Sequence, residues 1–291
     1  MRLSAFVAAH PACVLVEIVE ARGSTPREAG TVMLVADNAL CGTIGGGQLE
    51  YMAIDNARAM LSGRGEAKMD IPLGPEIGQC CGGRTVLSFA VMTPERAAAL
   101  QARMHRADAA RPSVVLFGAG HVGHALASAL APLPFAVTLV ETRSNALEGL
   151  PAEVATRLTP MPEEEVDRIP PGGAVLILTH DHALDFLIAE RALKRPDLAY
   201  VGMIGSATKR ATFAHWLKRQ ENGGEQAETS MARLVLPVGG TLVRDKRPEV
   251  IAAMVAAELL VTYATRHQQA QEQQVSERQV TSGRTAPSLP E

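Results

Sequence analysis

The sequence predicts an α/β protein in which a small mixed α/β domain precedes a domain with a doubly wound parallel sheet. From residue 113 onward, short apolar runs alternate with helical patterns, which is typical of parallel strands joined by crossover helices. A glycine-rich loop, Gly118 to Gly123, follows the first of these strands directly and opens a helix. Together these observations predict a Rossmann-like second domain.

Composition excludes several classes of protein. The chain has 291 residues, enough for two domains with real cores, and its net charge of −3 gives no sign of a nucleic-acid partner. The first residues carry one basic side chain and an apolar stretch interrupted at His10-Pro11, which fits neither a signal peptide nor a membrane span. Four cysteines without framework spacing indicate reduced thiols. We therefore expect a cytoplasmic protein with no membrane partner.

The first domain is expected to cover residues 1–108. Its predicted strands are 13–20, 31–35 and 84–91, and its predicted helices are 48–61 and 94–104, followed by a linker at 106–112. Gly45, Gly46 and Gly47 lead into the first of these helices and can form a backbone nest for an anion, with Arg27 near it. The alternative is that these glycines serve only an awkward turn.

The second domain is expected to cover residues 112–265. Its predicted parallel strands are 114–117, 137–140, 174–178 and 199–204, and each of the last two runs into a polar or glycine-containing turn and then a helix. Residues 266–291 are rich in Gln, Ser, Arg and Pro with little to bury, so this tail is expected to be disordered.

Cys80 and Cys81 stand side by side in Gly78-Gln79-Cys80-Cys81-Gly82-Gly83. Adjacent Cα atoms lie about 3.8 Å apart, whereas disulfides need roughly 4.4 to 6.8 Å, so a bond between these two cysteines would be strained. The motif therefore indicates thiol chemistry rather than a structural disulfide. The alternative is a pair of small apolar residues packed in a tight turn.

The loop Gly118-Ala119-Gly120-His121-Val122-Gly123 stands where a Rossmann domain has its phosphate loop. Its glycines allow a close approach of the backbone, and the helix N-terminus offers N–H groups to an anion. Glu141 ends the next strand, where an acid binds ribose hydroxyls. We expect an anionic ligand here; the alternative is a dinucleotide-like fold that keeps these glycines for helix packing alone.

Two further polar turns follow strands of the predicted sheet. The segment His180-Asp181-His182 predicts either metal ligands or a helix cap made by Asp181.

The second turn contains Gly205 and Ser206 and places Lys209 and Arg210 in the first turn of a helix. Cations at that end oppose the helix dipole, and an anionic ligand would remove the conflict. A solvated charged face is the alternative.

Several catalytic patterns are missing from the sequence. It contains no G-x-S-x-G elbow, no H-E-x-x-H, no Walker A sequence and no C-x-x-C pair. Because no general base stands beside a nucleophile, the sequence favours a protein that holds a ligand over an enzyme.

Six motifs, taken in order, resemble those of the XdhC/CoxI family, the accessory proteins of xanthine dehydrogenase. They are Gly23-Ser24-Thr25-Pro26-Arg27, Gly42 to Glu50, Gly78 to Gly83, Gly118 to Gly123, Thr179 to His182, and Gly202 to Ser206 with Lys209 and Arg210. The resemblance covers about residues 10–262. Gln48 stands where relatives that serve carbon monoxide dehydrogenase carry Cys, which favours xanthine dehydrogenase as the client.

The resemblance implies a homodimeric carrier that binds molybdenum cofactor (molybdopterin) and supports its terminal sulfuration by a cysteine desulfurase. The carrier receives the cofactor from its biosynthesis proteins and inserts it into apo xanthine dehydrogenase. In this hypothesis Cys80 or Cys81, with Gln79 beside them, contacts the molybdenum, since soft thiolates suit that metal. The loop from Gly118 to Gly123 then holds the phosphate or nucleotide-like end.

Two other functions stay open. One is an NAD(P)-dependent oxidoreductase, which the glycine loop and Glu141 favour although no proton donor for hydride transfer is identified. The other is a thiol-based redox regulator in which Cys80 and Cys81 oxidise and a bound dinucleotide reports metabolic state.

Overall fold

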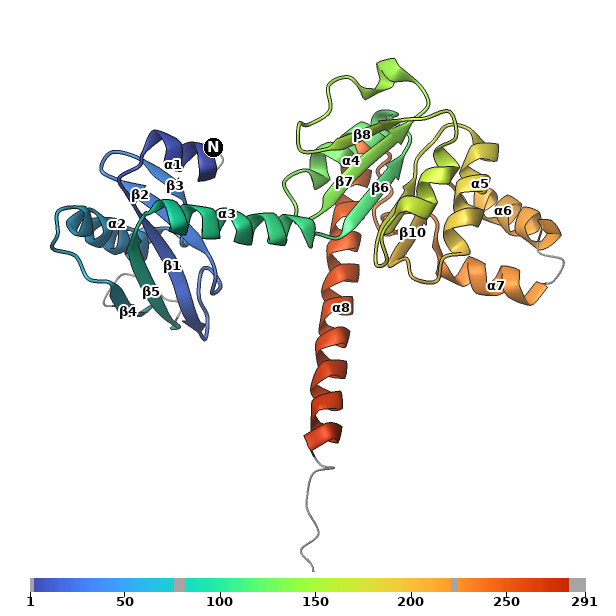
Figure 1. Cartoon of the computed structure of the whole chain (residues 1–291). Helices are drawn as coiled ribbons and strands as arrows, with labels where there is room; N and C mark the ends of the chain where they lie inside the picture. Colours follow the sequence, from blue (N-terminus) through green and yellow to red (C-terminus); the bar gives the residue numbers. More distant parts are fainter. Residues whose placement is uncertain (1–2, 76–81, 221–223, 283–291) are drawn as a thin grey trace, which may run out of the picture. The chain divides into compact units, whose positions relative to one another are not determined.

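The computed structural model describes residues 3–75, 82–220 and 224–282, and the chain divides into two compact units between Asp108 and Ala109. We call residues 1–108 unit 1 and residues 109–291 unit 2. Figure 1 labels most of the helices and strands of both units.

Unit 1 is a five-stranded antiparallel sheet with helices on both faces. The strand order is β3-β2-β1-β5-β4, and every neighbouring pair is antiparallel. The strands are β1 (Cys13–Arg22), β2 (Val32–Ala36), β3 (Leu40–Gly42), β4 (Lys68–Pro72) and β5 (Arg84–Val91). The helices are α1 (Leu3–Ala9), α2 (Gly47–Leu61) and α3 (Pro94–Ala109).

Successive residues of β1 point to opposite faces of this sheet. Val14 packs with Leu49 of α2 on one face. Its neighbour Cys13 packs on the other face with Phe6 of α1 and Leu100 of α3. Both faces are buried, which is why β1 begins as a continuous apolar run.

Unit 2 contains the doubly wound sheet that the sequence predicts, and this prediction is confirmed. The strand order is β11-β10-β9-β6-β7-β8, and all pairs are parallel. Counted from β6, this is the Rossmann order 3-2-1-4-5-6, and the direction of winding reverses between β6 and β9. The strands are β6 (Ser113–Phe117), β7 (Ala136–Glu141), β8 (Ala155–Leu158), β9 (Ala174–Ile177), β10 (Tyr200–Met203) and β11 (Leu234–Val235).

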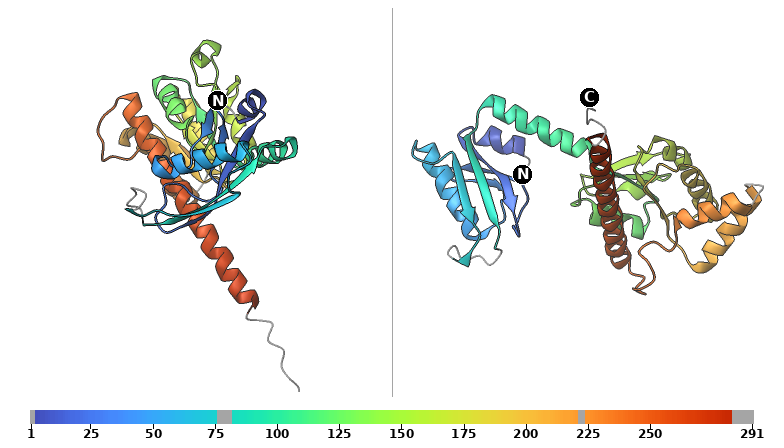
Figure 2. Two further views of the ribbon diagram at one scale, coloured as in Figure 1. Left: turned by 90° about the vertical axis from the view of Figure 1, so that its left-hand side faces the viewer. Right: turned by 90° about the horizontal axis from the view of Figure 1, so that it is seen from below.

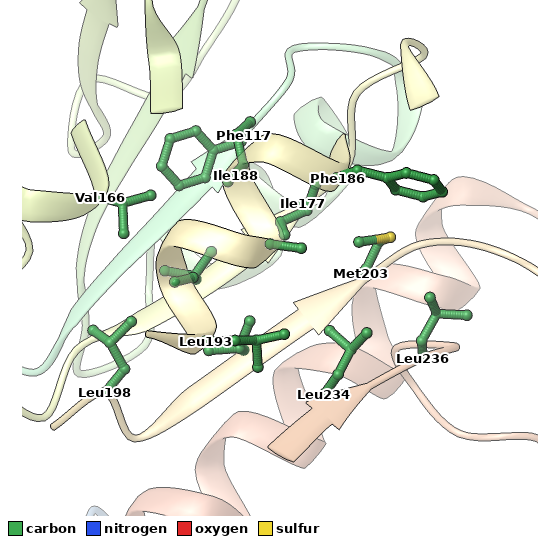
Figure 3. Close-up of a cluster of buried hydrophobic side chains, with 14 of the residues drawn as sticks. Phe117, Val166, Ile177, Phe186, Ile188, Leu193, Leu198, Met203, Leu234 and Leu236 are labelled. Atoms are coloured by element: carbon green, nitrogen blue, oxygen red, sulfur yellow. The ribbon is translucent and has the colours of Figure 1, made fainter. Parts of the chain in front are cut away.

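Helices cover both faces of the unit 2 sheet. They are α4 (His121–Leu130), α5 (His182–Leu193), α6 (Ala207–Gln220), α7 (Gly224–Arg233) and α8 (Pro248–Ser282), with short 3-10 turns η2 (Ser144–Leu147) and η3 (Pro162–Arg168). In β6, Leu116 faces the core formed with α4 and α8, whereas Phe117 faces the core formed with α5 and α6. Figure 3 shows this second cluster, where Phe117, Ile177 and Phe186 gather.

Helix α8 is the element that differs most from expectation. The tail from residue 266 was expected to be disordered, but α8 continues to Ser282 and extends beyond the sheet (Figures 1 and 2). Residues 266–282 are rich in Gln and also contain Glu and Arg, which are good helix formers, so local propensity continues a helix that the apolar residues before them have started.

The first 26 residues of α8, Pro248–Gln273, form the one stretch among the described residues that is long and apolar enough to cross a membrane, with a mean hydropathy of 1.4 over its most apolar 18 residues. Length and composition alone are weak signs of a span, since core helices pass the same test. Ala252, Val255, Ala256 and Leu259 of this stretch pack in the core of unit 2.

Candidate functional site

The carboxyl ends of β6 and β9 meet at a crevice in unit 2. At this topological switch point a cavity of about 500 Å³ opens between the loops that follow β6, β7, β9 and β10. It is lined by the predicted residues Gly118, Gly120, His121 and Glu141, together with Arg143, Thr179 and His180. The structure therefore brings together the glycine loop, Glu141 and the histidine turn, which lie far apart in the sequence.

Glycine occupies three positions of the loop for different structural reasons. A Cβ on Gly123 would lie 2.1 Å from the Gly118 carbonyl oxygen, and a Cβ on Gly118, whose φ is +110°, would lie 2.9 Å from the backbone of Leu178. These two glycines are required by packing. Among the residues that the structure describes, a Cβ on Gly120 would meet nothing within 4 Å, so packing does not explain this glycine. Open space beside Gly120 suits a ligand that approaches the backbone closely.

The start of α4 is open to an anion. Gly120 is the N-cap residue, and in the described part of the chain no side chain caps the first amides of the helix. No acidic residue lies in its first turn, where the helix dipole favours negative charge. His121 is exposed there and lines the cavity.

Glu141 lines the crevice, but its carboxylate is hydrogen-bonded to the glycine loop. Its carboxylate is 5% exposed and accepts hydrogen bonds from the Ala119 amide (2.9 Å), the Thr142 amide (2.8 Å) and Arg143 Nη2 (3.0 Å). Burial by itself raises the pKa of Glu141, but the bonds from Arg143, Ala119 and Thr142 outweigh it and lower the pKa to about 2. The expected contact of Glu141 with ribose hydroxyls is thus replaced by contacts within the protein.

Arg143 is the residue that sequence reasoning missed at this end of the crevice. Its side chain is half-exposed, lines the 500 Å³ cavity and also lines a larger, shallower hollow between α4 and the start of α8. Hydrogen bonding to Glu141 raises the pKa of Arg143, so the guanidinium stays charged. The sequence does contain a signal for this residue, because an arginine stands two residues beyond the acid that ends the second strand.

A second, polar cavity of about 360 Å³ lies at the carboxyl ends of β9 and β10. It is lined by Gly205, Ser206 and Lys209, as the sequence predicts for one turn, and also by His180, His182 and three threonines. Because Thr179, His180 and Ile204 line both cavities, the two are neighbours along the same edge of the sheet.

Lys209 forms a buried ion pair that the sequence did not reveal. Its Nζ contacts the carboxylate of Asp185, which has no exposed surface, and donates to the Ile204 carbonyl at 3.0 Å. The other carboxylate oxygen of Asp185 accepts from the Thr179 hydroxyl at 2.6 Å. The pair joins the turn after β9 to the start of α6.

Arg210 also has protein partners. Its guanidinium donates to the carbonyl oxygens of Met231 and Leu234, each at 3.0 Å. The sequence suggested that an anionic ligand offsets Lys209 and Arg210 near the helix start. Asp185 offsets the charge of Lys209, and these carbonyl groups offset that of Arg210. The argument for an anionic ligand at this helix start is therefore wrong.

The histidine turn acts as a helix cap. Asp181 accepts from the amides of Ala183 (2.8 Å) and Leu184 (3.3 Å), as the capping alternative predicted. Within residues 3–75, 82–220 and 224–282, no group of three or more His, Cys, Asp or Glu side chains could hold a metal ion. His180 and His182 instead line the polar cavity.

The glycine nest in unit 1 is filled from within the chain. Glu50 accepts hydrogen bonds from the amides of Ile44 (3.0 Å) and Gly46 (3.1 Å) and from the Thr43 hydroxyl. The nest expected at Gly45-Gly46-Gly47 does bind an anion, but that anion is a side chain of α2. Arg27 lies beside the loop, since a Cβ on Gly45 would be 3.6 Å from its Cγ.

Gln79, Cys80 and Cys81 lie outside the described residues, whereas Gly82 and Gly83 of the same motif are described. A Cβ on Gly83 would lie 2.2 Å from the Ser24 carbonyl oxygen, and a Cβ on Gly23 would lie 3.4 Å from the Gly83 Cα. Further along the same motif, Pro26 packs against Gly45, since a Cβ on Gly45 would lie 2.7 Å from the Pro26 side chain. Three motifs that resemble family motifs, Gly23 to Arg27, the glycine nest and the end of the cysteine segment, therefore converge within unit 1.

Fold and crevice define a protein of two α/β units whose second unit is a Rossmann domain. A family model described as the XdhC Rossmann domain matches residues 114–259, and one described as the XdhC and CoxI family matches residues 6–71. The chain therefore belongs to the XdhC and CoxI family.

Two individual proteins are also similar to the chain. The chain is 30% identical over 255 residues to the uncharacterized protein YqeB of Escherichia coli K12, covering 84% of this chain but only 42% of YqeB. It has the fold of a Bacillus halodurans protein named a xanthine dehydrogenase, with a TM-score of 0.74 and 17% identity over 91% of this chain and 95% of that one. The chain thus spans less than half the length of YqeB.

Proposed function

We propose that this protein is an accessory factor in the maturation of xanthine dehydrogenase: a carrier that binds molybdenum cofactor, supports its sulfuration and inserts it into the apo enzyme. Its partners in this proposal are the apo dehydrogenase, a cysteine desulfurase and the proteins that make the cofactor. The carrier works in the cytoplasm as a homodimer and performs no turnover of its own. Membership in the XdhC and CoxI family supports the role in maturation.

The convergence of motifs in unit 1 is the observation that carries the proposal. Gly83, at the end of the cysteine segment, packs on Ser24, and Gly45 of the glycine nest packs on Pro26 and Arg27, so both motifs contact the stretch from Gly23 to Arg27. We assign contact with molybdenum to Cys80 or Cys81, since soft thiolates are suitable ligands for this metal.

The crevice of unit 2 has donors that suit a phosphate group. The uncapped amides at the start of α4, the open space beside Gly120 and the Arg143 guanidinium are all compatible with a phosphate monoester. In the proposal these residues bind and orient the phosphate end of the cofactor. The pterin and its metal supply the redox chemistry of the client enzyme.

The test is retention of the cofactor during anaerobic purification from cells that make it. Molybdenum is measured by metal analysis, and pterin by fluorescence after oxidation. We expect the Cys80→Ala/Cys81→Ala protein to retain less molybdenum than the wild type, whereas the matched control Cys13→Ala, which changes a cysteine buried in the core of unit 1, retains as much. Equal retention in the double variant would refute the role of the cysteines. Folded wild-type protein with neither molybdenum nor pterin would refute the carrier function.

A further inference from the structure

We propose that the Rossmann crevice of unit 2 binds a dinucleotide with a 2′-phosphate, NADP or NADPH, in preference to NAD or NADH. This goes beyond the carrier function, because it assigns a second class of ligand to the protein. In Rossmann domains the residues at the end of the second strand decide the choice. An acid accepts from the ribose 2′-hydroxyl of NAD, whereas an arginine accommodates the 2′-phosphate of NADP.

Glu141 cannot serve as the ribose acceptor. Its Oε2 accepts from the Ala119 amide and from Arg143 Nη2, and its Oε1 accepts from the amide and hydroxyl of Thr142 and from the amide and Nε of Arg143. These six donors exceed the roughly four lone-pair sites of a carboxylate. With 5% of its surface exposed, Glu141 has no acceptor left for a hydroxyl group of a ligand.

Arg143 takes the place of that acceptor at the rim of the crevice. Its side chain is 49% exposed, and its bonds to Glu141 use Nε and Nη2, which leaves Nη1 for a ligand. Arginine binds phosphate through its fork of N–H groups, and a 2′-phosphate is dianionic, so it gains more from this guanidinium than a hydroxyl does. The neighbouring Glu141 carboxylate opposes part of this attraction, and the backbone amides of Ala119, Thr142 and Arg143 offset part of its charge.

The crevice also has the extent of a dinucleotide site. The 500 Å³ cavity spans from Arg143 past Gly120 to Thr179 and His180, and the 360 Å³ polar cavity continues from there to Ser206 and Lys209. The pyrophosphate then lies at the uncapped start of α4, where Gly120 leaves room for it. One half of the dinucleotide lies on the β7 side of the loop and the other on the β9 side.

The experiment measures binding of NADPH, NADH and 2′,5′-ADP by calorimetry and by NADPH fluorescence. Protein is prepared from cells that cannot make molybdenum cofactor, because a pterin phosphate would occupy the same amides of α4. We expect the wild type to bind NADPH at least about tenfold more tightly than NADH. Arg143→Ala should lose about that factor for NADPH and 2′,5′-ADP while NADH changes less than about twofold. Arg219→Ala, which removes an exposed arginine of α6, is the matched control and should bind like the wild type.

Equal affinity of the wild type for NADPH and NADH, or no binding of either, would overturn the proposal without any variant. A uniform loss for both dinucleotides in Arg143→Ala would also overturn it. None of these results bears on the carrier function, which is measured by retained molybdenum and pterin. Conversely, NADPH binding by a protein that never retains pterin would leave this inference standing and remove the carrier function.

Discussion

The carboxylate of Glu141 accepts a hydrogen bond from the backbone amide of Ala119 at 2.9 Å, across 22 residues of sequence. The bond ties the end of β7 to the glycine loop after β6. It uses one loop amide for the protein itself and leaves the amides from Gly120 onward at the helix start for a ligand. The loop is thus held in place before any ligand binds, which is the usual requirement of a preorganised anion site.

Glu141 should make the stability of unit 2 depend on pH. Its pKa is lowered from 4.5 to about 2 in the folded protein, so its contribution is present above pH 4.5 and is lost as the pH falls toward 2. The difference corresponds to roughly 3 kcal/mol at neutral pH. We expect Glu141→Gln to lower the free energy of unfolding by about 2 to 3 kcal/mol at pH 7 and by less near pH 3.

The measurement is urea unfolding followed by the fluorescence of Trp216. This is the single tryptophan of the chain, and it packs against Phe186 and Phe213 in the core of unit 2, so it reports on that unit. Glu148→Gln, at an exposed position nearby, is the control. A pH dependence in Glu141→Gln equal to that of the wild type would contradict the prediction.

Gly120 and Gly123 should respond differently to alanine. Gly120→Ala places a Cβ in open space at a φ of −78°, so unit 2 should lose only about 0.5 to 1 kcal/mol, because alanine is a poorer N-cap residue than glycine, while ligand binding in the crevice falls. Gly123→Ala places its Cβ 2.1 Å from the Gly118 carbonyl oxygen and should cost about 1 to 3 kcal/mol or more. Unfolding of both variants, together with their NADPH affinity and pterin retention, checks this. If Gly120→Ala binds every ligand as the wild type does, the loop is structural only.

Removing only one partner of the ion pair between Lys209 and Asp185 should lower the free energy of unfolding strongly. Lys209→Met leaves the fully buried Asp185 carboxylate without its charged partner, and we expect a loss of about 3 to 5 kcal/mol. Lys209→Met/Asp185→Leu removes both charges and should recover much of that loss. The wild type, the two single variants Lys209→Met and Asp185→Leu, and the double variant form a double-mutant cycle. Their free energies of unfolding are compared under the same conditions. Additive losses would show that the two side chains do not interact.

Glu50 should hold the glycine nest of unit 1 together. Removing its carboxylate in Glu50→Ala deprives the Ile44 and Gly46 amides of their acceptor, which should cost about 1 to 3 kcal/mol. Hydrogen exchange measured by mass spectrometry should become faster in peptides that cover residues 43–47. Glu66→Ala, at an exposed site after α2, is the control and should leave those peptides unchanged. Unaltered exchange in Glu50→Ala would mean that the nest keeps its shape without the carboxylate.

Apolar runs in the sequence predicted most strands of both units, because those strands are buried on both faces. Strand β5 runs from Arg84 to Val91, as predicted. All four edge strands were missed: β3 (Leu40–Gly42), β4 (Lys68–Pro72), β8 (Ala155–Leu158) and β11 (Leu234–Val235). All four residues of β8 and most residues of β4 are exposed. An exposed strand has no apolar pattern from which it can be recognised in the sequence.

The sequence by itself determined the order of the elements, the glycine loops at their ends and the family, since these depend on local patterns along the chain. Only the tertiary structure decided which groups fill those loops. Glu50 occupies the first nest, Glu141 takes the amide of Ala119, and Asp185 pairs with Lys209, 24 residues away. Such pairs depend on which strand ends meet at one edge of a sheet. That is set by strand order and packing, and no spacing within a single segment encodes it.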